Sequence, residues 1–459
     1  MSLQKKMFRH MATKGRSKLE PTQIIAIAFA LIIALGTLLL SLPIASRSGV
    51  SCGFRPALFT ATSATCVTGL VLYDTWSQWS GFGQVVILCL IELGGLGFMT
   101  AASLVILLLR KKVGVRQRMI MAQALSMSDM DSVVRLQKWV LFGSLLIQFT
   151  GAVILFLRFL PNYGWTTAAK WSVFHAVSAF CNAGFDIVGS LQPGASMMVF
   201  QHDPVVLLTL SGLVILGGLG FFVWEEVVRL HSWKKFSVYT KLVLLMSGVL
   251  LVGGTVGFCL LEWNNPDTLG PMSVPHKILN GFFQSVTVRT AGFMSVDQGL
   301  LTSAGKGLSM GLMLIGGSSG STAGGAKTVT LLVLVLFIIA RARGRNSVCV
   351  FKRTIPSAQV MDAMTIVSIL VSLAFFGAVF ISATSPISFT DSLYETVSAL
   401  ATVGLTSGGT ANLSVSSQIL IIIYMYFGRV GVLTLSLGFL MGNKAEDRFR
   451  YAQTNLLIG

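Results

Sequence analysis

Four short segments of the chain repeat one pattern around a single glycine, and the chemistry that this pattern offers is cation coordination. The glycines are Gly69, Gly184, Gly292 and Gly404, spaced 115, 108 and 112 residues apart, and an aromatic residue precedes each by ten positions. Because glycine tolerates positive φ, a loop centred on it can turn its carbonyl oxygens toward one axis. Rings of backbone carbonyls can replace the water shell of a cation. The four turns predict an ion filter; re-entrant loops with a structural role are the alternative.

The candidate filter residues are each glycine and the three residues before it. They are Cys66, Val67, Thr68, Gly69, Cys181, Asn182, Ala183, Gly184, Arg289, Thr290, Ala291, Gly292, Ala401, Thr402, Val403 and Gly404. The lining lacks carboxylates, which argues against an acidic ring, and one glycine per turn implies fewer strict carbonyl sites than two would. Arg289 is expected behind the filter, paired with Glu395 or Asp391.

A second candidate site interrupts the sixth apolar run between residues 316 and 327. Its composition is poor for a helix, and the apolar run resumes at Val329. Irregular backbone at membrane depth is tolerated only against protein or in a water-filled cavity, so a gate beneath the filter is expected, with a kink of no function as the alternative. The candidate gate residues are Gly316, Gly317, Ser318, Ser319, Gly320, Ser321, Thr322, Ala323, Gly324, Gly325 and Lys327.

Arg429 completes the candidate gate. It stands in mid-span where sister spans carry Gly95 and Gly218. An arginine at the bilayer centre costs about 2.5–3.5 kcal/mol on insertion scales, so it should face the cavity rather than lipid. It either tunes ion flux through its charge or latches the structure by bonds to backbone carbonyls.

The elements that must position these residues are membrane helices. The chain has 459 residues, 53% apolar and 11% charged, and a mean hydropathy of +0.77. Because a spanning helix needs about 20 apolar residues, the composition predicts a multi-span membrane protein. Eight apolar runs are long enough, near 22–42, 84–109, 139–160, 205–228, 240–261, 308–339 (interrupted), 360–382 and 418–441.

Each glycine turn follows a half-length segment that is too short to cross the bilayer, near 55–66, 170–181, 278–289 and 390–401. The sequence therefore predicts an all-α polytopic membrane protein with four span–re-entrant loop–span repeats around a central pore. The expected boundaries are an N-terminal tail over 1–20, repeats over 21–110, 139–230, 239–341 and 358–442, and a C-terminal tail over 443–459.

Charge predicts the orientation of the spans. Of the 34 Lys and Arg residues, 25 lie in the two tails and in the connections around 110–138, 229–241 and 341–353. Positive residues mark the cytoplasmic side, so both termini are expected there. The net charge of +17 then reflects topology and contact with anionic lipid heads, and it is spread too widely for a nucleic-acid surface.

Other classes of protein fit less well. The six cysteines show no metal spacing, and among the five histidines only His175 lies in a re-entrant segment, so neither a cofactor nor an enzyme active site is expected. The 320–328 segment departs from a phosphate-binding loop because Ala326 separates the glycine from Lys327. A secondary transporter of another cation or small solute is the alternative function, but it would need an inverted repeat.

The chain resembles the Trk/Ktr/HKT superfamily of potassium transporters over nearly its whole length. The matching segments are Val67–Leu70, Phe180–Phe185, Arg289–Phe293, Ala401–Leu405, the Gly/Ser run 316–325 before Lys327, and Phe427–Gly431. A single span before the first turn is similar to the membrane subunit of Ktr systems.

The resemblance implies a function and partners. It implies potassium uptake across the bacterial cytoplasmic membrane, with stimulation by sodium left open and K⁺ or Na⁺ as the transported or coupling ion. It also implies a homodimer with one pore per chain and a cytoplasmic ring of RCK-type nucleotide-binding subunits as regulator. The tail up to Gly459 is expected to pack at the dimer interface.

Overall fold

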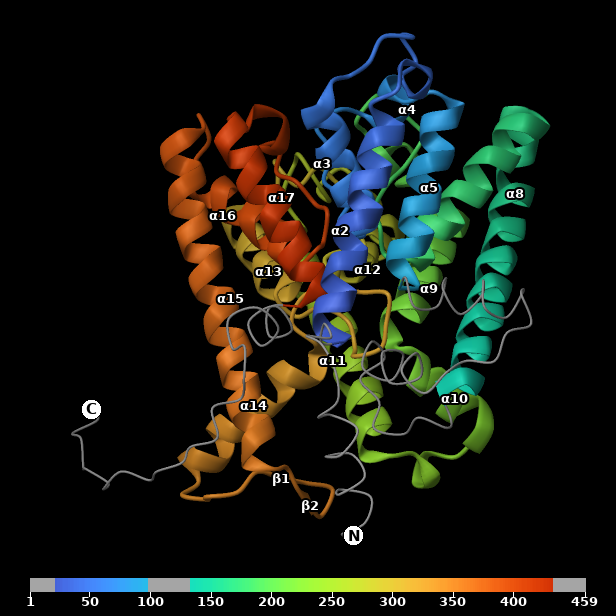
Figure 1. Cartoon of the computed structure of the whole chain (residues 1–459). Coiled ribbons are helices and arrows are strands. Elements are labelled where there is room, and N and C mark those ends of the chain that lie inside the picture. The colour runs from blue at the N-terminus through green and yellow to red at the C-terminus, as the bar shows by residue number, and fades with distance from the viewer. Residues whose placement is uncertain (1–20, 98–132, 432–459) are drawn as a thin grey trace, which may run out of the picture.

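The computed structural model describes residues 21–97 and 133–431, which form a helical bundle (Figure 1). The helices are α2 (Pro21–Leu40), α3 (Phe54–Thr65), α4 (Thr75–Gln78), α5 (Gly81–Gly95), α8 (Val133–Phe180), α9 (Pro204–Leu219), α10 (Phe221–Leu230), α11 (Val238–Glu262), α12 (Val274–Thr287), α13 (Ser303–Met313), α14 (Thr328–Ala342), α15 (Ser357–Thr384), α16 (Phe389–Leu400) and α17 (Val415–Val430). Short 3₁₀ turns and one hairpin, β1 (Cys349–Val350) with β2 (Arg353–Thr354), connect them.

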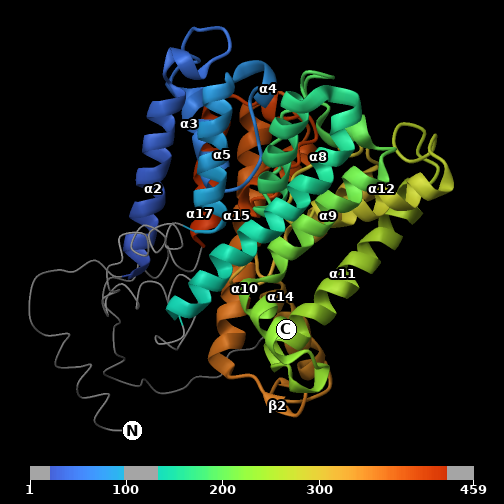
Figure 2. The same ribbon diagram turned by 90° about the vertical axis from the view of Figure 1, so that its right-hand side faces the viewer.

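The helices pack as four similar groups arranged in a circle. Within the groups, α2 packs on α3, α8 on α9, α11 on α12, and α15 on α16. Between groups, α5 contacts α8, α9 contacts α12, α13 contacts α16, and α17 returns to α3. The last contact closes the circle, so the region around the four half-length helices is enclosed on all sides, as two perpendicular views show (Figures 1 and 2).

The half-length helices expected from the sequence are present. They are α3, α12, α16 and the C-terminal part of α8, which is separated from the preceding span by a break at Gly164, where φ is 71°. Local signals set the start of several helices. Ser388 accepts a hydrogen bond from the backbone N–H of Asp391 at the start of α16, and Thr302 accepts one from Gly305 at the start of α13.

The number of membrane-spanning helices agrees only in part with the eight apolar runs of the sequence. Within the described ranges, α2, α8, α11 and α15 are long and apolar enough to cross a membrane, and α9 with α10 makes a fifth if the bent pair counts as one. The runs at 84–109 and 418–441 extend into residues that are not described. The run at 308–339 is divided into α13 and α14 by the irregular loop, as expected.

The uninterrupted span expected near 205–228 is wrong. The chain bends by 95° between α9 and α10, at Gly220, whose φ of 94° lies in the left-handed region. A side chain there would lie 2.9 Å from the carbonyl oxygen of Ser319, so the break lets the irregular loop approach the backbone. Gly217, Gly218 and Gly220 cluster at this bend, but glycines in a membrane helix can also serve close packing, so the cluster alone does not predict a break.

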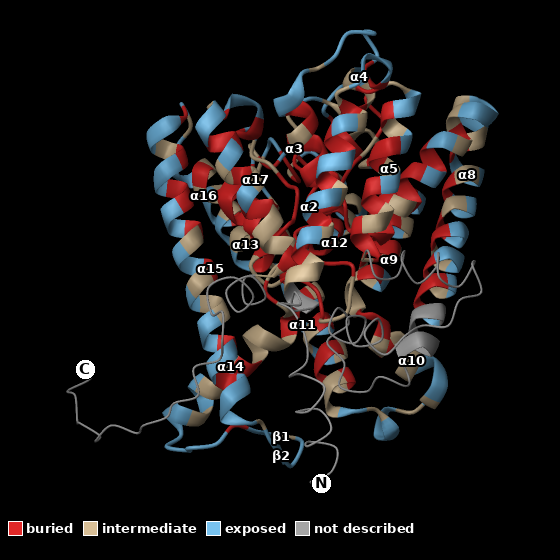
Figure 3. Ribbon diagram, viewed as in Figure 1, coloured by how far each residue is buried: buried red, intermediate tan, exposed pale blue. Residues whose placement is uncertain are grey.

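Burial is highest in the centre of the bundle and lower on its outside (Figure 3). Many of the exposed residues are large and apolar. On α2 the exposed side chains include Leu31 and Leu35, and on α15 they include Phe376, which is 67% exposed. A water-soluble protein buries such residues, so these outer faces are suited to lipid. The centre is instead rich in buried Ser, Thr and Gln side chains.

Candidate functional site

Each half-length helix ends directly at one of the glycine loops. Residues Cys66, Cys181, Val288 and Ala401 follow the last helical residue, and the glycine comes three or four positions later. The C-terminal end of a helix carries a partial negative charge from its free carbonyls. Four helix ends that converge on one region therefore favour a cation there.

The backbone of the four loops has one conformation. In every loop the glycine and the residue two positions before it have positive φ: Val67 (56°) and Gly69 (98°), Asn182 (59°) and Gly184 (69°), Thr290 (73°) and Gly292 (83°), Thr402 (50°) and Gly404 (90°). Positive φ is rare for β-branched residues and costs on the order of 1–3 kcal/mol at each position. The same pair of positive φ angles in four separate segments indicates one shared task for the backbone.

The four loops meet in a closed ring. A methyl group placed on Gly69 would lie 2.5 Å from the carbonyl oxygen of Ala183, one on Gly184 would lie 2.8 Å from that of Ala291, and one on Gly292 would lie 2.6 Å from that of Val403. A methyl group on Gly404 would collide with the carbonyl oxygen of Thr68. Each glycine thus faces the residue before the next glycine, and the contacts run from loop one to loop four and back. The sequence expectation that the loops converge is met.

Hydroxyl groups on the half-length helices hold the loops in shape. The N–H of Gly69 donates to Ser63 Oγ (3.0 Å), and the N–H of Gly404 donates to Ser398 Oγ (3.1 Å). In the other loops Ser178 Oγ donates to the carbonyl of Phe185, and Thr287 Oγ1 to that of Phe293, each at 2.7 Å. Sequence reasoning missed these residues, although a Ser or Thr five or six positions before each glycine was a visible signal.

The irregular loop between α13 and α14 lies against the ends of two of the glycine loops. Thr322 Oγ1 donates to the carbonyl of Phe180, the last residue of α8, at 3.1 Å. A side chain on Gly324 would collide with Thr402, and one on Gly325 would lie 3.2 Å from the carbonyl of Ala401. The segment expected as a gate is therefore in direct contact with filter loops two and four.

Further bonds tie the same loop to the bend between α9 and α10. The N–H of Ser318 donates to the carbonyl of Gly218 (3.0 Å), and the N–H of Phe221 donates to that of Gly320 (2.8 Å). Tyr239 of α11 donates to the carbonyl of Ser319 at 2.9 Å. The base of the loop is closed by the N–H of Gly316, which donates to Ala326. The loop is ordered by many weak contacts rather than by a single anchor.

Two basic side chains, Lys327 at the end of the loop and Arg429 of α17, donate hydrogen bonds to the backbone of this loop. Lys327 Nζ donates to the carbonyl of Ala323 at 2.8 Å. The Arg429 guanidinium donates to the carbonyl of Thr322 with one nitrogen and to the carbonyls of Gly94 and Gly95 with another. Arg429 therefore joins the loop to the end of α5 through backbone carbonyls.

The expected pairing of Arg289 is wrong. Asp391 forms an ion pair with Lys306 at 2.9 Å, and Glu395 accepts bonds from hydroxyls and backbone instead. Arg289 lines a small cavity with Gly218 and Gly317, and within the described parts of the chain its Nε has no hydrogen-bond partner. Asp391 is instead paired with Lys306 of the adjacent α13. The spacing of residues in the sequence does not reveal that these two helices are neighbours.

Together, the bundle and its ring of loops define a multi-pass membrane protein built from four similar units around one axis. A family model described as a cation transport protein, TrkH, matches residues 4–448. The chain belongs to the TrkH family of cation transport proteins.

Full-length relatives support this assignment. The chain is 40% identical to the potassium/sodium uptake protein NtpJ of Enterococcus hirae, over 98% of this chain and 99% of that protein. It is 39% identical to the Ktr system potassium uptake protein B of Bacillus subtilis, over 96% and 97% of the two chains. The crystal structure of the potassium transporter TrkH from Vibrio parahaemolyticus has the same fold, with a TM-score of 0.71 at 17% identity over 93% of this chain and 86% of that one.

Proposed function

We propose that this chain takes up potassium across the bacterial cytoplasmic membrane, through a pore that its four glycine loops form. The closed ring of loops with paired positive φ angles is the observation that carries the proposal. Backbone carbonyls held around one axis suit a monovalent cation that sheds its water. The names of the relatives, potassium/sodium uptake protein and Ktr system potassium uptake protein, support potassium as the cargo.

The proposed filter is the set of sixteen residues at the four loops, and the proposed gate is the segment from Gly316 to Lys327 with Arg429. The loop touches Phe180 and Thr402 at the filter, so its displacement would open a path that its present position obstructs. Entry down an inside-negative potential gains about 2.3 kcal/mol per charge for each 100 mV, so the transport itself requires no nucleotide site on this chain.

The proposed assembly is a homodimer regulated by an RCK-type nucleotide-binding ring, with both termini on the cytoplasmic side. The name of the relative in the Ktr system supports a multi-component transporter. Both tails lie outside the described residues. The β1–β2 hairpin, which carries Lys352 and Arg353 next to exposed Phe351, is part of a basic connection that this proposal assigns to the cytoplasmic side.

Expression in a bacterium that lacks its own potassium uptake systems tests the proposal. We expect growth at low external potassium to be restored, and rubidium uptake to be inhibited by potassium more strongly than by sodium. The assay is run with and without added sodium, because sodium stimulation is a separate question. Absence of rescue with the protein inserted in the membrane, in the presence of its native partner, would contradict potassium uptake.

A further inference from the structure

One half-length helix differs from the other three at the residues ten and nine positions before its glycine. The aromatic residue ten positions before the glycine is Phe59, Phe174 and Phe282 in the first three repeats, but Tyr394 in the fourth. The next residue, Glu395, is a carboxylate only in this repeat. Tyr394 and Glu395 are both fully buried, so their polar groups require partners within the protein.

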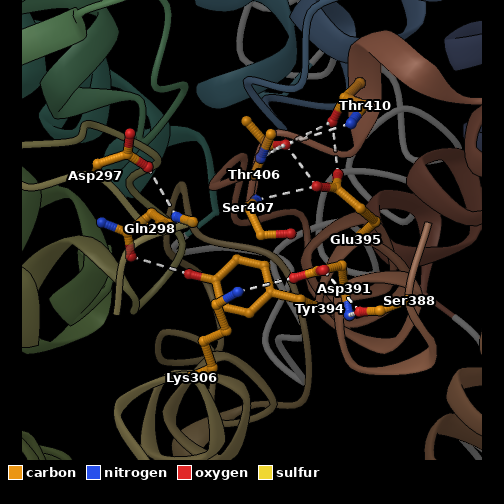
Figure 4. Close-up of polar contacts among 12 residues, drawn as sticks. Asp297, Gln298, Lys306, Ser388, Asp391, Tyr394, Glu395, Thr406, Ser407 and Thr410 are labelled. Carbon is orange, nitrogen blue, oxygen red and sulfur yellow. Dashed lines mark hydrogen bonds and ion pairs between the residues drawn. The ribbon is translucent and has the colours of Figure 1, made fainter. Parts of the chain in front are cut away.

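Tyr394 connects the fourth repeat to the third. Its hydroxyl donates to Gln298 Oε1 at 2.9 Å, across 96 positions of sequence (Figure 4). Gln298 follows the third filter loop and also donates to the carbonyl of Val296 at 2.7 Å. Gln284 of α12 donates to the same Gln298 oxygen and accepts from its amide nitrogen. Gln298 therefore ties the segment that follows the third glycine loop to α12 of its own repeat and to α16 of the fourth repeat.

Glu395 holds the corresponding segment of the fourth repeat. Its carboxylate accepts hydrogen bonds from Thr406 Oγ1 and Thr410 Oγ1, each at 2.5 Å, and from the N–H of Ser407 at 3.1 Å (Figure 4). Since Thr406 lies only two residues after Gly404, this carboxylate fixes the exit of filter loop four.

The segments that follow the third and fourth glycine loops, here called the outer segments, also touch each other. A side chain on Gly299 would lie 2.9 Å from the carbonyl oxygen of Ser407, so segments three and four run in close contact. Lys306 of α13 and Asp391 of α16 add an ion pair across the same seam at 2.9 Å. The bonds of Gln298 to Tyr394 and of Lys306 to Asp391 join repeat three to repeat four, and the bond of Thr406 to Glu395 joins a loop exit to a helix. None of these side chains belongs to the sixteen filter residues.

We propose that Tyr394 and Glu395 are positioning residues that set the preference of the pore for potassium over sodium. They fix the outer segments that follow loops three and four, and so they fix the spacing of the carbonyl oxygens that these loops contribute. Potassium and sodium differ mainly in size, so a ring that relaxes on one side loses discrimination before it loses conduction. This inference rests on the proposed filter function of the loops.

The test compares single hydroxyl deletions in the full-length protein with its native partner. Tyr394→Phe gives the fourth repeat the residue type of the other three and removes one bond. We expect the potassium-over-sodium preference, measured as the ratio of their inhibition constants for rubidium uptake, to fall roughly three- to tenfold, the range that one net hydrogen bond represents. Tyr424→Phe is the matched control, because its hydroxyl bonds the carbonyl of Leu373 at 3.0 Å, away from these segments, and the ratio should stay at the wild-type value.

Two further variants separate positioning from general damage. Gln298→Leu should lower the ratio at least as much as Tyr394→Phe, because it also removes the bonds to Gln284 and to the Val296 carbonyl. The double variant should be no worse than Gln298→Leu alone, because the Tyr394 bond is already lost in that variant. Thr406→Val, which removes a donor to Glu395, should lower the ratio on its own and tests the second link if a Tyr394 variant fails to insert.

The outcomes distinguish this inference from the filter proposal. Gly404→Ser serves as the reference for a change in the filter itself. A wild-type ratio in Tyr394→Phe and Thr406→Val beside an altered ratio in Gly404→Ser overturns the positioning role and leaves the filter standing. A wild-type ratio in Gly404→Ser as well contradicts the filter, and with it the inference. Fully additive effects of Tyr394→Phe and Gln298→Leu also overturn the proposed link.

Discussion

Arg429 Nη2 donates a hydrogen bond to the carbonyl oxygen of Gly95, 3.0 Å away, across 334 positions of sequence. The same guanidinium binds the carbonyl of Thr322 in the irregular loop. Arg429 thus links the fourth repeat, the first repeat and the loop of the third. A fixed positive charge beside the proposed gate would oppose the passage of cations and would also stabilise the loop in its present position.

Replacement of this arginine should raise flux. We expect Arg429→Ala to increase the maximal rate of rubidium uptake per inserted molecule several-fold, because it removes both the charge and the link to Thr322. The potassium-over-sodium preference should hold, since the filter residues are untouched. Uptake normalised to protein in the membrane measures the effect. Arg429→Lys keeps the charge without the planar donor fork and is the control; a normalised Arg429→Ala rate at or below wild type would count against the barrier role.

The irregular loop should limit conduction at rest. Partial deletion between Ser318 and Gly324 should increase uptake in the absence of an activating partner, because it removes an obstruction and not a ligand. Thr322→Val is the milder companion, which deletes the hydroxyl bond to Phe180 at nearly constant volume and should shift the rate in the same direction. Loss of uptake by an inserted and folded deletion variant would instead favour a binding role for the loop.

Labelling of Cys349 tests the orientation of the protein. This thiol is exposed on the β1–β2 hairpin, and hydrogen bonds with the hydroxyls of Thr354 and Ser347 hold its pKa below the usual range. A lowered pKa means a larger thiolate fraction near neutral pH, so the residue should react readily with a maleimide. A membrane-impermeant maleimide should label it in inverted vesicles and not in intact cells. Cys349→Ser is the control, and labelling of Cys349 from outside would reverse the proposed topology.

Removal of the C-terminal tail tests the proposed dimer. Truncation after Gln453 removes the apolar end Leu456 to Ile458, which follows a charged segment. We expect weaker dimerisation, seen by native mass spectrometry as a larger monomer fraction at low concentration. A truncated protein that dimerises as well as the full chain would refute a role for the tail.

Repetition made much of the architecture predictable from the sequence. The four glycines and their half-length helices share one pattern, so each copy supports the others, and the poor helix propensity between Gly316 and Lys327 marks the break between α13 and α14. The same reasoning failed at Gly220, because a glycine cluster in an apolar run is compatible with close packing of a straight helix as well as with a 95° bend.

The spacing of residues in the sequence could not predict which buried polar side chains pair over long range. Arg289 was expected to pair with Glu395 or Asp391, but these carboxylates are engaged by Thr406 and Lys306. The partner of a buried charged side chain depends on which helices lie next to it, and tertiary packing decides that. The link between Tyr394 and Gln298 has the same origin, although the change from Phe to Tyr in one repeat of four was a signal in the sequence.

The most direct test of the account replaces each filter glycine by serine. At Gly69, Gly184, Gly292 and Gly404 a side chain meets both a positive φ and a carbonyl of the next loop, at 2.8 Å or less from an added methyl group in every case. The measurement is the potassium-over-sodium preference of each variant, as the ratio of inhibition constants for rubidium uptake in the uptake-deficient bacterium. The account predicts a weaker preference in all four variants with the protein still inserted. Four variants that keep the wild-type preference would contradict it.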